Sequence, residues 1–217
     1  MDDKARDAAF ISALTTEHFV LQAAASSTVA DAAARSSLYI FALSSSLIAM
    51  GFVSQSPDVF PIFVAAVLPA LFLLGVVTVV RLIDTALENN QYLAGIARIR
   101  AYYRTLTADA AEYFSAETGR WPEAATTEPS LGLGTIMAFF STTATMVAFI
   151  DSIVAAAGIA LLVDFVAGGV STAVGLLFGA ATFVLLMTAF YLFQRWRFDT
   201  TALARPPATP RRSDRSA

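Results

Sequence analysis

The chain has 217 residues, of which 57% are hydrophobic and only 14% are charged, whereas about 25% of the residues of an ordinary soluble domain are charged. A mean hydropathy of +0.65 excludes a disordered or collagen-like chain, and the absence of cysteine excludes a disulfide scaffold, a thiolate metal site and a cysteine nucleophile. The net charge of −3 gives no reason to expect a nucleic-acid partner.

The N-terminal segment, residues 1–36, is predicted to be a helix outside the membrane. It has no apolar core followed by a small-residue cleavage site, so no signal peptide is expected. Residues 16–35 are rich in alanine and lack glycine and proline, which favours a helix that runs directly into the first span. An apolar stripe at spacings of three and four includes the only histidine, His18, which we therefore expect to pack rather than to bind a metal.

Two apolar segments, 37–54 and 59–80, are each long enough to cross a hydrocarbon core about 30 Å thick as a helix. Between them lie only residues 55–58, whose Pro57 and Asp58 favour a tight turn. The second segment contains Pro69, which lacks an N–H donor and is predicted to bend the helix.

Residues 81–134 are predicted to be a helix followed by a loop. An apolar face continues from Arg81 to Phe114, so we expect a helix that projects from the membrane and packs on the N-terminal helix or on a second subunit. The alternative is a bent pair of helices folded back against the headgroups. Residues 115–134 have the glycine, proline, serine and threonine content of a loop.

Two further spans are predicted at 143–163 and 170–193, joined by the short link 164–169. Residues 194–217 are predicted to be a disordered tail, because their end is proline-rich, charged and without apolar periodicity. The fold class is therefore all-α: a polytopic membrane protein with four transmembrane helices and helical cytoplasmic extensions.

The positive charges predict the orientation. All 14 lysine and arginine residues precede the first span, lie between the second and third, or follow the fourth, whereas the two short turns carry only Asp58 and Asp164. The positive-inside rule then places both termini and the central segment in the cytoplasm. Together with the missing signal peptide, this predicts a multi-pass protein of the plasma (inner) membrane.

Asp151 is the one charged residue inside the third span. An ionisable group costs about 2.5 to 3.5 kcal/mol at the centre of a span and is expected to face protein or water. Counting inward from the cytoplasmic boundary places Asp151 level with Gly75, which would allow close helix approach, and with a polar layer formed by Ser44, Ser45, Ser46 and Thr188. The layer is either a proton or cation station or a hydrogen-bonded packing site; a third interpretation is that Asp151 lies nearer the cytoplasmic interface.

Gly175 and Gly179 form a small-xxx-small pattern in the fourth span. This pattern allows two helices to approach closely, either within the chain or between two subunits.

The strings ISALTTEHFVLQ, ARSSLYIFALSSSLIAMGF and IARIRAYY resemble an uncharacterised group of small four-span membrane proteins of high-GC Gram-positive bacteria. The resemblance covers most of residues 11–163. It implies a bacterial inner-membrane protein and provides no catalytic or binding residues to transfer.

The sequence contains no Walker lysine, HExxH, GxSxG or dinucleotide fingerprint, so neither an enzyme nor a cofactor or metal site is predicted. Our first hypothesis is an oligomeric, non-enzymatic sensor or interaction protein whose partners are the lipid bilayer, further copies of the chain and an unknown cytoplasmic protein. The alternative is a small ion channel or proton-coupled transporter that uses the polar layer around Asp151.

Overall fold

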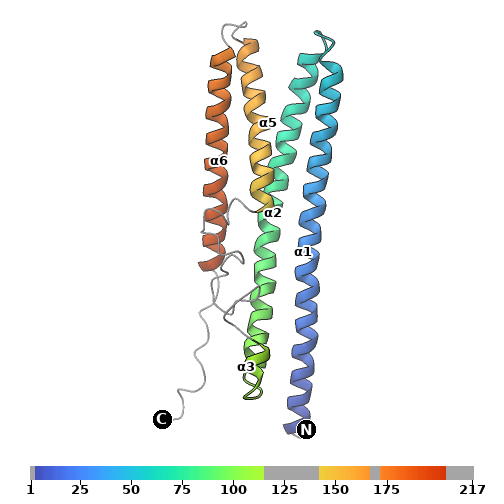
Figure 1. The fold of residues 1–217 in the computed structure, drawn as a ribbon, viewed down its shortest axis with the longest axis vertical. Helices are drawn as coiled ribbons and strands as arrows, with labels where there is room; N and C mark the ends of the chain where they lie inside the picture. The colour runs from blue at the N-terminus through green and yellow to red at the C-terminus, as the bar shows by residue number, and fades with distance from the viewer. Residues whose placement is uncertain (1–2, 115–141, 167–171, 204–217) are drawn as a thin grey trace.

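The computed structural model describes residues 3–114, 142–166 and 172–203. Its elements are α1 (Asp3–Val53), α2 (Phe60–Tyr103), the single turn α3 (Ala110–Tyr113), α5 (Thr143–Val166) and α6 (Thr172–Leu203) (Figure 1). Four of these helices, α1, α2, α5 and α6, are long and apolar enough to cross a membrane. The protein is therefore an all-α, four-helix membrane protein, which confirms the predicted fold class.

The first two helices are unusually long. With 51 and 44 residues, α1 and α2 extend over about 76 and about 66 Å at a rise of about 1.5 Å per residue. Between Asp3 and Met50 the sequence of α1 contains neither glycine nor proline, so nothing interrupts its hydrogen-bond ladder. Pro61 lies in the first turn of α2, where a missing N–H leaves no bond unmade.

The four long helices alternate in direction and form an open bundle (Figure 1). α1 packs on α2, α2 on α5, and α5 on α6, whereas α1 with α5 and α2 with α6 make only slight contact. The middle helices therefore have two neighbours and the outer helices have one.

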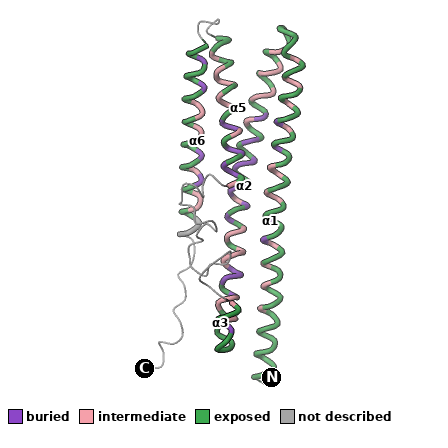
Figure 2. The backbone as a smooth tube through the Cα atoms, viewed as in Figure 1, coloured by how far each residue is buried: buried purple, intermediate pink, exposed green. Residues whose placement is uncertain are grey.

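Burial follows from this arrangement. Purple segments concentrate on α2 and α5 in Figure 2, whereas α1 is largely green. In the most apolar stretch of α1 only 6% of residues are buried, against 22% in α2 and 28% in α5. The core combines aliphatic residues of the two middle helices with two residues of α1 and one of α6, and includes Tyr39, Leu43, Leu71, Val79, Leu82, Ile83, Val147, Ala148, Val154 and Phe190.

Beyond Arg35 and Arg81 the paired helices continue together, and we name this part the stalk: residues 3–35 of α1 and 82–103 of α2. The rings of Phe10 and Tyr102 meet edge to face at 5.4 Å. The Thr28 hydroxyl donates to Asn89 Oδ1 at 3.2 Å. The predicted extension is therefore present as a helical hairpin in line with the spans (Figure 1).

The contact between α1 and α2 has heptad spacing. The α1 residues that are buried or partly buried along its α2 side include Leu14, His18, Leu21, Ala25, Thr28, Ala32, Arg35, Tyr39, Ala42, Ser46, Ala49 and Val53. Their alternating spacing of four and three is that of a coiled-coil seam. The seam fixes which faces of α1 point away from α2.

Two boundaries differ from the prediction. α2 ends at Tyr103 instead of continuing to Phe114, because the backbone N–H and the hydroxyl of Thr105 both bond to the carbonyl of Tyr102 and tighten the chain into a turn. α6 continues to Leu203, so residues 194–203 of the predicted disordered tail are helical. No proline interrupts α6, since the first proline after Thr172 is Pro206. The predicted loop 115–134 and the tail beyond residue 203 lie outside the described residues.

Candidate functional site around Asp151

Asp151 on α5 is buried, with 3% of its surface exposed. The hydroxyl of Tyr39, which is fully buried on α1, donates to Asp151 Oδ1 at 3.1 Å. Since α1 and α5 otherwise make only slight contact, this hydrogen bond is a direct link between these two helices, in addition to the packing of each on α2.

Gly75 on α2 makes room for that link. A Cβ added at Gly75 would lie 2.0 Å from Asp151 Oδ1 and 2.2 Å from its Cγ. No real Cβ tolerates such distances, so the carboxyl group occupies the space that any other residue at position 75 would fill. The expected closeness of Gly75 and Asp151 is present.

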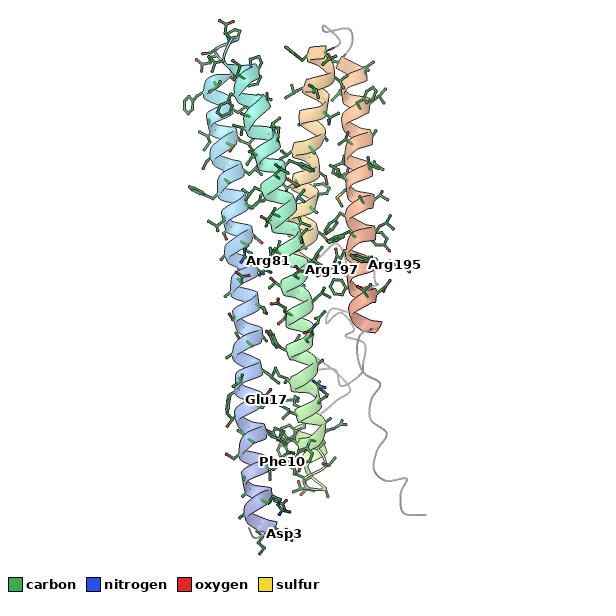
Figure 3. The ribbon with its side chains drawn as sticks, turned by 180° about the vertical axis from the view of Figure 1, so that it is seen from behind. Asp3, Phe10, Glu17, Arg81, Arg195 and Arg197 are labelled. Carbon is green, nitrogen blue, oxygen red and sulfur yellow. The ribbon has the colours of Figure 1, made fainter. Side chains whose placement is uncertain are left out.

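The site lies near the arginine-bearing ends of the spans. Tyr39 follows Arg35 by four residues and Gly75 precedes Arg81 by six, which corresponds to about 6 and about 9 Å along the helices. Arg81, Arg195 and Arg197 lie at nearly the same height in Figure 3. Asp151 is therefore close to the arginine-rich boundary of the spans.

The predicted polar layer is not assembled around Asp151. Ser44 and Ser45 are exposed on α1, and Ser46 is partly buried. The Thr188 hydroxyl is exposed and donates to the carbonyl of Val184 in its own helix. Counting residues gives the height of a side chain but not its direction, and at about 100° per residue Ser44 and Ser45 point away from the face that carries Tyr39.

Other hydroxyls near the site bond within their own helices. Ser152 is buried and donates to the carbonyl of Ala148, and Thr78 donates to the carbonyl of Leu74. The result is a set of locally satisfied groups rather than a chain of polar contacts across the membrane.

A groove of about 300 Å³ between α2, α5 and α6 reaches the Asp151 side chain. Apart from Asp151 and Ser152 its walls are apolar, and they include Phe72, Val76, Val79, Leu186, Phe190 and Phe193. Towards the other membrane surface α2 and α5 diverge (Figure 1), and a larger apolar groove of about 850 Å³ lies there, lined among others by Phe60, Pro69, Phe72, Gly158, Phe165 and Leu186.

Gly175 and Gly179 lie where α6 packs on α5. A Cβ at Gly175 would be 3.0 Å from the carbonyl oxygen of Ala160, and one at Gly179 would be 2.9 Å from that of Ala156. These glycines therefore let α6 approach the backbone of α5 within one chain.

Ion pairs mark the boundary between spans and stalk. The Arg35 Nε donates to Asp31 Oδ2 at 2.8 Å, and Arg197 of α6 pairs with Asp84 of α2. The hydrogen bond from Arg35, aided by the charges of Arg35 and Arg81, lowers the pKa of the Asp31 carboxyl below its ordinary value. Of these two pairs, Arg197–Asp84 links α6 to the stalk, whereas Arg35–Asp31 lies within α1.

His18 lies in the stalk, next to the rings of Phe19 and Tyr103. Its Nδ1 is buried and has no hydrogen-bond partner within the described part of the chain. Among residues 3–114, 142–166 and 172–203, no three side chains of His, Cys, Asp or Glu gather where they could hold a metal ion.

Comparison with protein-family models, with curated proteins and with solved structures gave no match. The site must therefore be interpreted from its own geometry.

Sequence reasoning missed Tyr39 as the partner of Asp151, because a tyrosine close to a span boundary is commonly an interfacial anchor. A signal was present: Tyr39 falls on the heptad that continues from Leu21, Thr28 and Ala32. A phenol on a packed face needs a hydrogen-bond partner, and Asp151 is the carboxylate available inside the spans.

Proposed function

We propose that this protein is a non-enzymatic, oligomeric membrane interaction protein whose stalk is the docking or sensing element. The stalk is the single observation that carries the proposal. Its two helices are uninterrupted continuations of membrane spans, so a force or a contact at one end is transmitted along a continuous hydrogen-bonded helix rather than across a flexible linker.

The positions of the charges support a cytoplasmic stalk. Arg35, Arg81 and Arg197 lie at the stalk end of the spans, and positively charged residues near span ends favour the cytoplasmic side. We therefore place the stalk and both termini in the cytoplasm, in the inner membrane of a bacterium.

The exposed surface of the stalk supports binding rather than transport. Phe19, Val20 and Val29 are each more than half exposed. Exposed apolar residues on a helix outside the lipid typify a surface that another protein covers.

A photo-reactive residue introduced in cells at Phe19 or Val29 tests this proposal, with Ser56 in the opposite turn as the control position. We expect protein adducts of defined mass at the two stalk positions and none of the same mass at Ser56. Absence of adducts from both stalk positions would contradict the proposal.

Transport is the second candidate, and the groove that reaches Asp151 is the observation in its favour. A relay needs a carboxyl that can ionise and a path to both surfaces, whereas the nearby hydroxyls of Ser152 and Thr78 bond within their own helices. Flux of protons, sodium and potassium in proteoliposomes separates the two candidates. We expect no flux above that of protein-free vesicles, and a flux that disappears in Asp151→Asn but persists in Ser45→Ala would favour transport.

A further inference from the structure

A column of small residues runs along the side of α1 that faces away from α2. Every seventh residue from the start of the helix to its end belongs to it: Ala9, Thr16, Ala23, Ala30, Ser37, Ser44 and Gly51. All seven are exposed. We name them the outer column; they occupy the heptad position opposite the seam with α2.

Large apolar side chains flank the outer column on both sides. Phe19 and Ile40 lie on one flank, and Val20 and Phe41 on the other, with 64%, 41%, 55% and 73% of their surfaces exposed. Between them, from Ser26 to Ala34, both flanks contain only serine and alanine. The surface is a shallow apolar trough that allows another helix to approach closely.

Apart from Arg6, which precedes Ala9 by three residues and lies on one flank, the charges of α1 avoid this surface. From residue 7 onward its charged residues are Asp7, Glu17, Asp31 and Arg35, and none of them lies in the outer column or in the positions that flank it. On an ordinary surface helix the outward side is the charged one. An uncharged outward side outside the membrane therefore indicates that another surface covers it.

The length of the outer column identifies that surface. Ala9, Thr16, Ala23 and Ala30 belong to the stalk, whereas Ser37, Ser44 and Gly51 belong to the span. Lipid would cover only the span part, and a soluble partner only the stalk part. A helix that continues from one environment into the other fits the whole column, and α1 itself is such a helix.

We propose that two copies of this chain associate through the outer columns of their α1 helices, in parallel, about a two-fold axis perpendicular to the membrane. Copies inserted with one orientation have parallel α1 helices, so each residue on the axis faces its own equivalent. Such a contact excludes charged residues, which would repel their copies, and favours small ones. The proposal rests on the oligomeric character proposed above and assigns its interface.

Cysteine cross-linking of the full chain in membranes tests this interface, since the sequence has no cysteine. Single substitutions Ala9→Cys, Ala23→Cys, Ala30→Cys and Ser37→Cys are nearly isosteric. We expect each to form disulfide-linked dimers upon mild oxidation, with about tenfold more product than Gln22→Cys or Val29→Cys, which are exposed on the adjacent side of α1. Equal yields at all six positions would overturn the proposal.

A bulky residue provides the second measurement. Ala23→Leu with Ala30→Leu should reduce cross-linking through Ala9→Cys about tenfold, whereas Gln22→Leu should leave it unchanged. If the purified chain in nanodiscs is a dimer whose cross-links form away from the outer column, the proposed interface is wrong although the oligomeric function stands. If the column cross-links but proteoliposomes conduct ions, the interface stands and the proposed function fails. A monomer in nanodiscs overturns both.

Discussion

Tyr39 and Asp151 meet inside the membrane, where the phenol of one donates to the carboxyl of the other at 3.1 Å above the bare backbone of Gly75. Three helices thus converge on one hydrogen bond, a few residues from the start of the stalk. The hydrogen bond of Asp151 therefore connects the α1–α2 hairpin, which carries the stalk, to the α5–α6 hairpin.

Removing the donor should loosen the bundle. Tyr39→Phe leaves the buried carboxyl without this bond, and we expect a loss of about 0.6 to 2 kcal/mol of stability, the range found for hydrogen bonds between helices in membranes. Asp151→Asn retains an acceptor and should remain close to wild type. Unfolding in mixed micelles measures the stability of both variants. A double-mutant cycle that combines Tyr39→Phe with Asp151→Leu gives the interaction energy between the two side chains. Additive effects of Tyr39→Phe and Asp151→Leu would contradict the link.

The packing at Gly75 can be tested with a one-carbon change. Gly75→Ala would place its Cβ 2.0 Å from Asp151 Oδ1, so we expect about 1 to 3 kcal/mol of destabilisation despite the better helix propensity of alanine. Gly51→Ala is the matched control, because its Cβ would meet nothing within 4 Å. Equal stabilities of the two variants would show that α2 and α5 do not approach as described.

The α5–α6 contact predicts a second size limit. Gly179→Leu must push α6 away from the carbonyl of Ala156, with an expected loss of about 1 to 3 kcal/mol, whereas Ala180→Leu on the exposed side of α6 should be tolerated. Thermal unfolding in detergent compares them. A destabilised Ala180→Leu beside a normal Gly179→Leu would reverse the assignment of the faces.

The stalk should also respond to acid. Because Arg35 lowers the pKa of the Asp31 carboxyl in the folded state below its ordinary value of 3.8, the unfolded chain binds the proton more readily. The stabilisation is therefore complete above the unfolded value and is lost as the pH falls through the folded one. We expect the helices of the wild type to melt at a higher temperature than those of Asp31→Asn at pH 6. This difference in melting temperature should vanish in acid and become smaller at about 1 M salt. A difference that grows in acid would contradict this sign.

Hydropathy and helix propensity were sufficient to predict the architecture. The four spans and the continuation of α1 follow from apolar runs and from the absence of glycine and proline, which are local properties. The partner of Asp151 does not follow from them, because the depth of a residue in a span leaves its direction around the helix open. Tyr39 shares the face that packs on α2, whereas Ser44 and Ser45 do not, and that distinction depends on which helices are neighbours.

The end of the second helix was also beyond local rules. The apolar face continues past Tyr103, yet the Thr105 hydroxyl bonds to the carbonyl of Tyr102 and helps to end the helix there. Threonine competes with the backbone only when its rotamer and surroundings allow it. α6, in contrast, is longer than predicted: the polar residues after Phe193 remain helical as far as Leu203.

We propose that the stalk stands in the cytoplasm while the turn between α1 and α2 faces the other side of the membrane. Thr107 at the stalk end and Ser56 in that turn are both exposed, and single cysteines at these positions can be labelled with a membrane-impermeant maleimide. In intact spheroplasts we predict labelling of Ser56→Cys alone, and in inverted vesicles labelling of Thr107→Cys alone. Labelling of Thr107→Cys in intact spheroplasts would contradict this orientation.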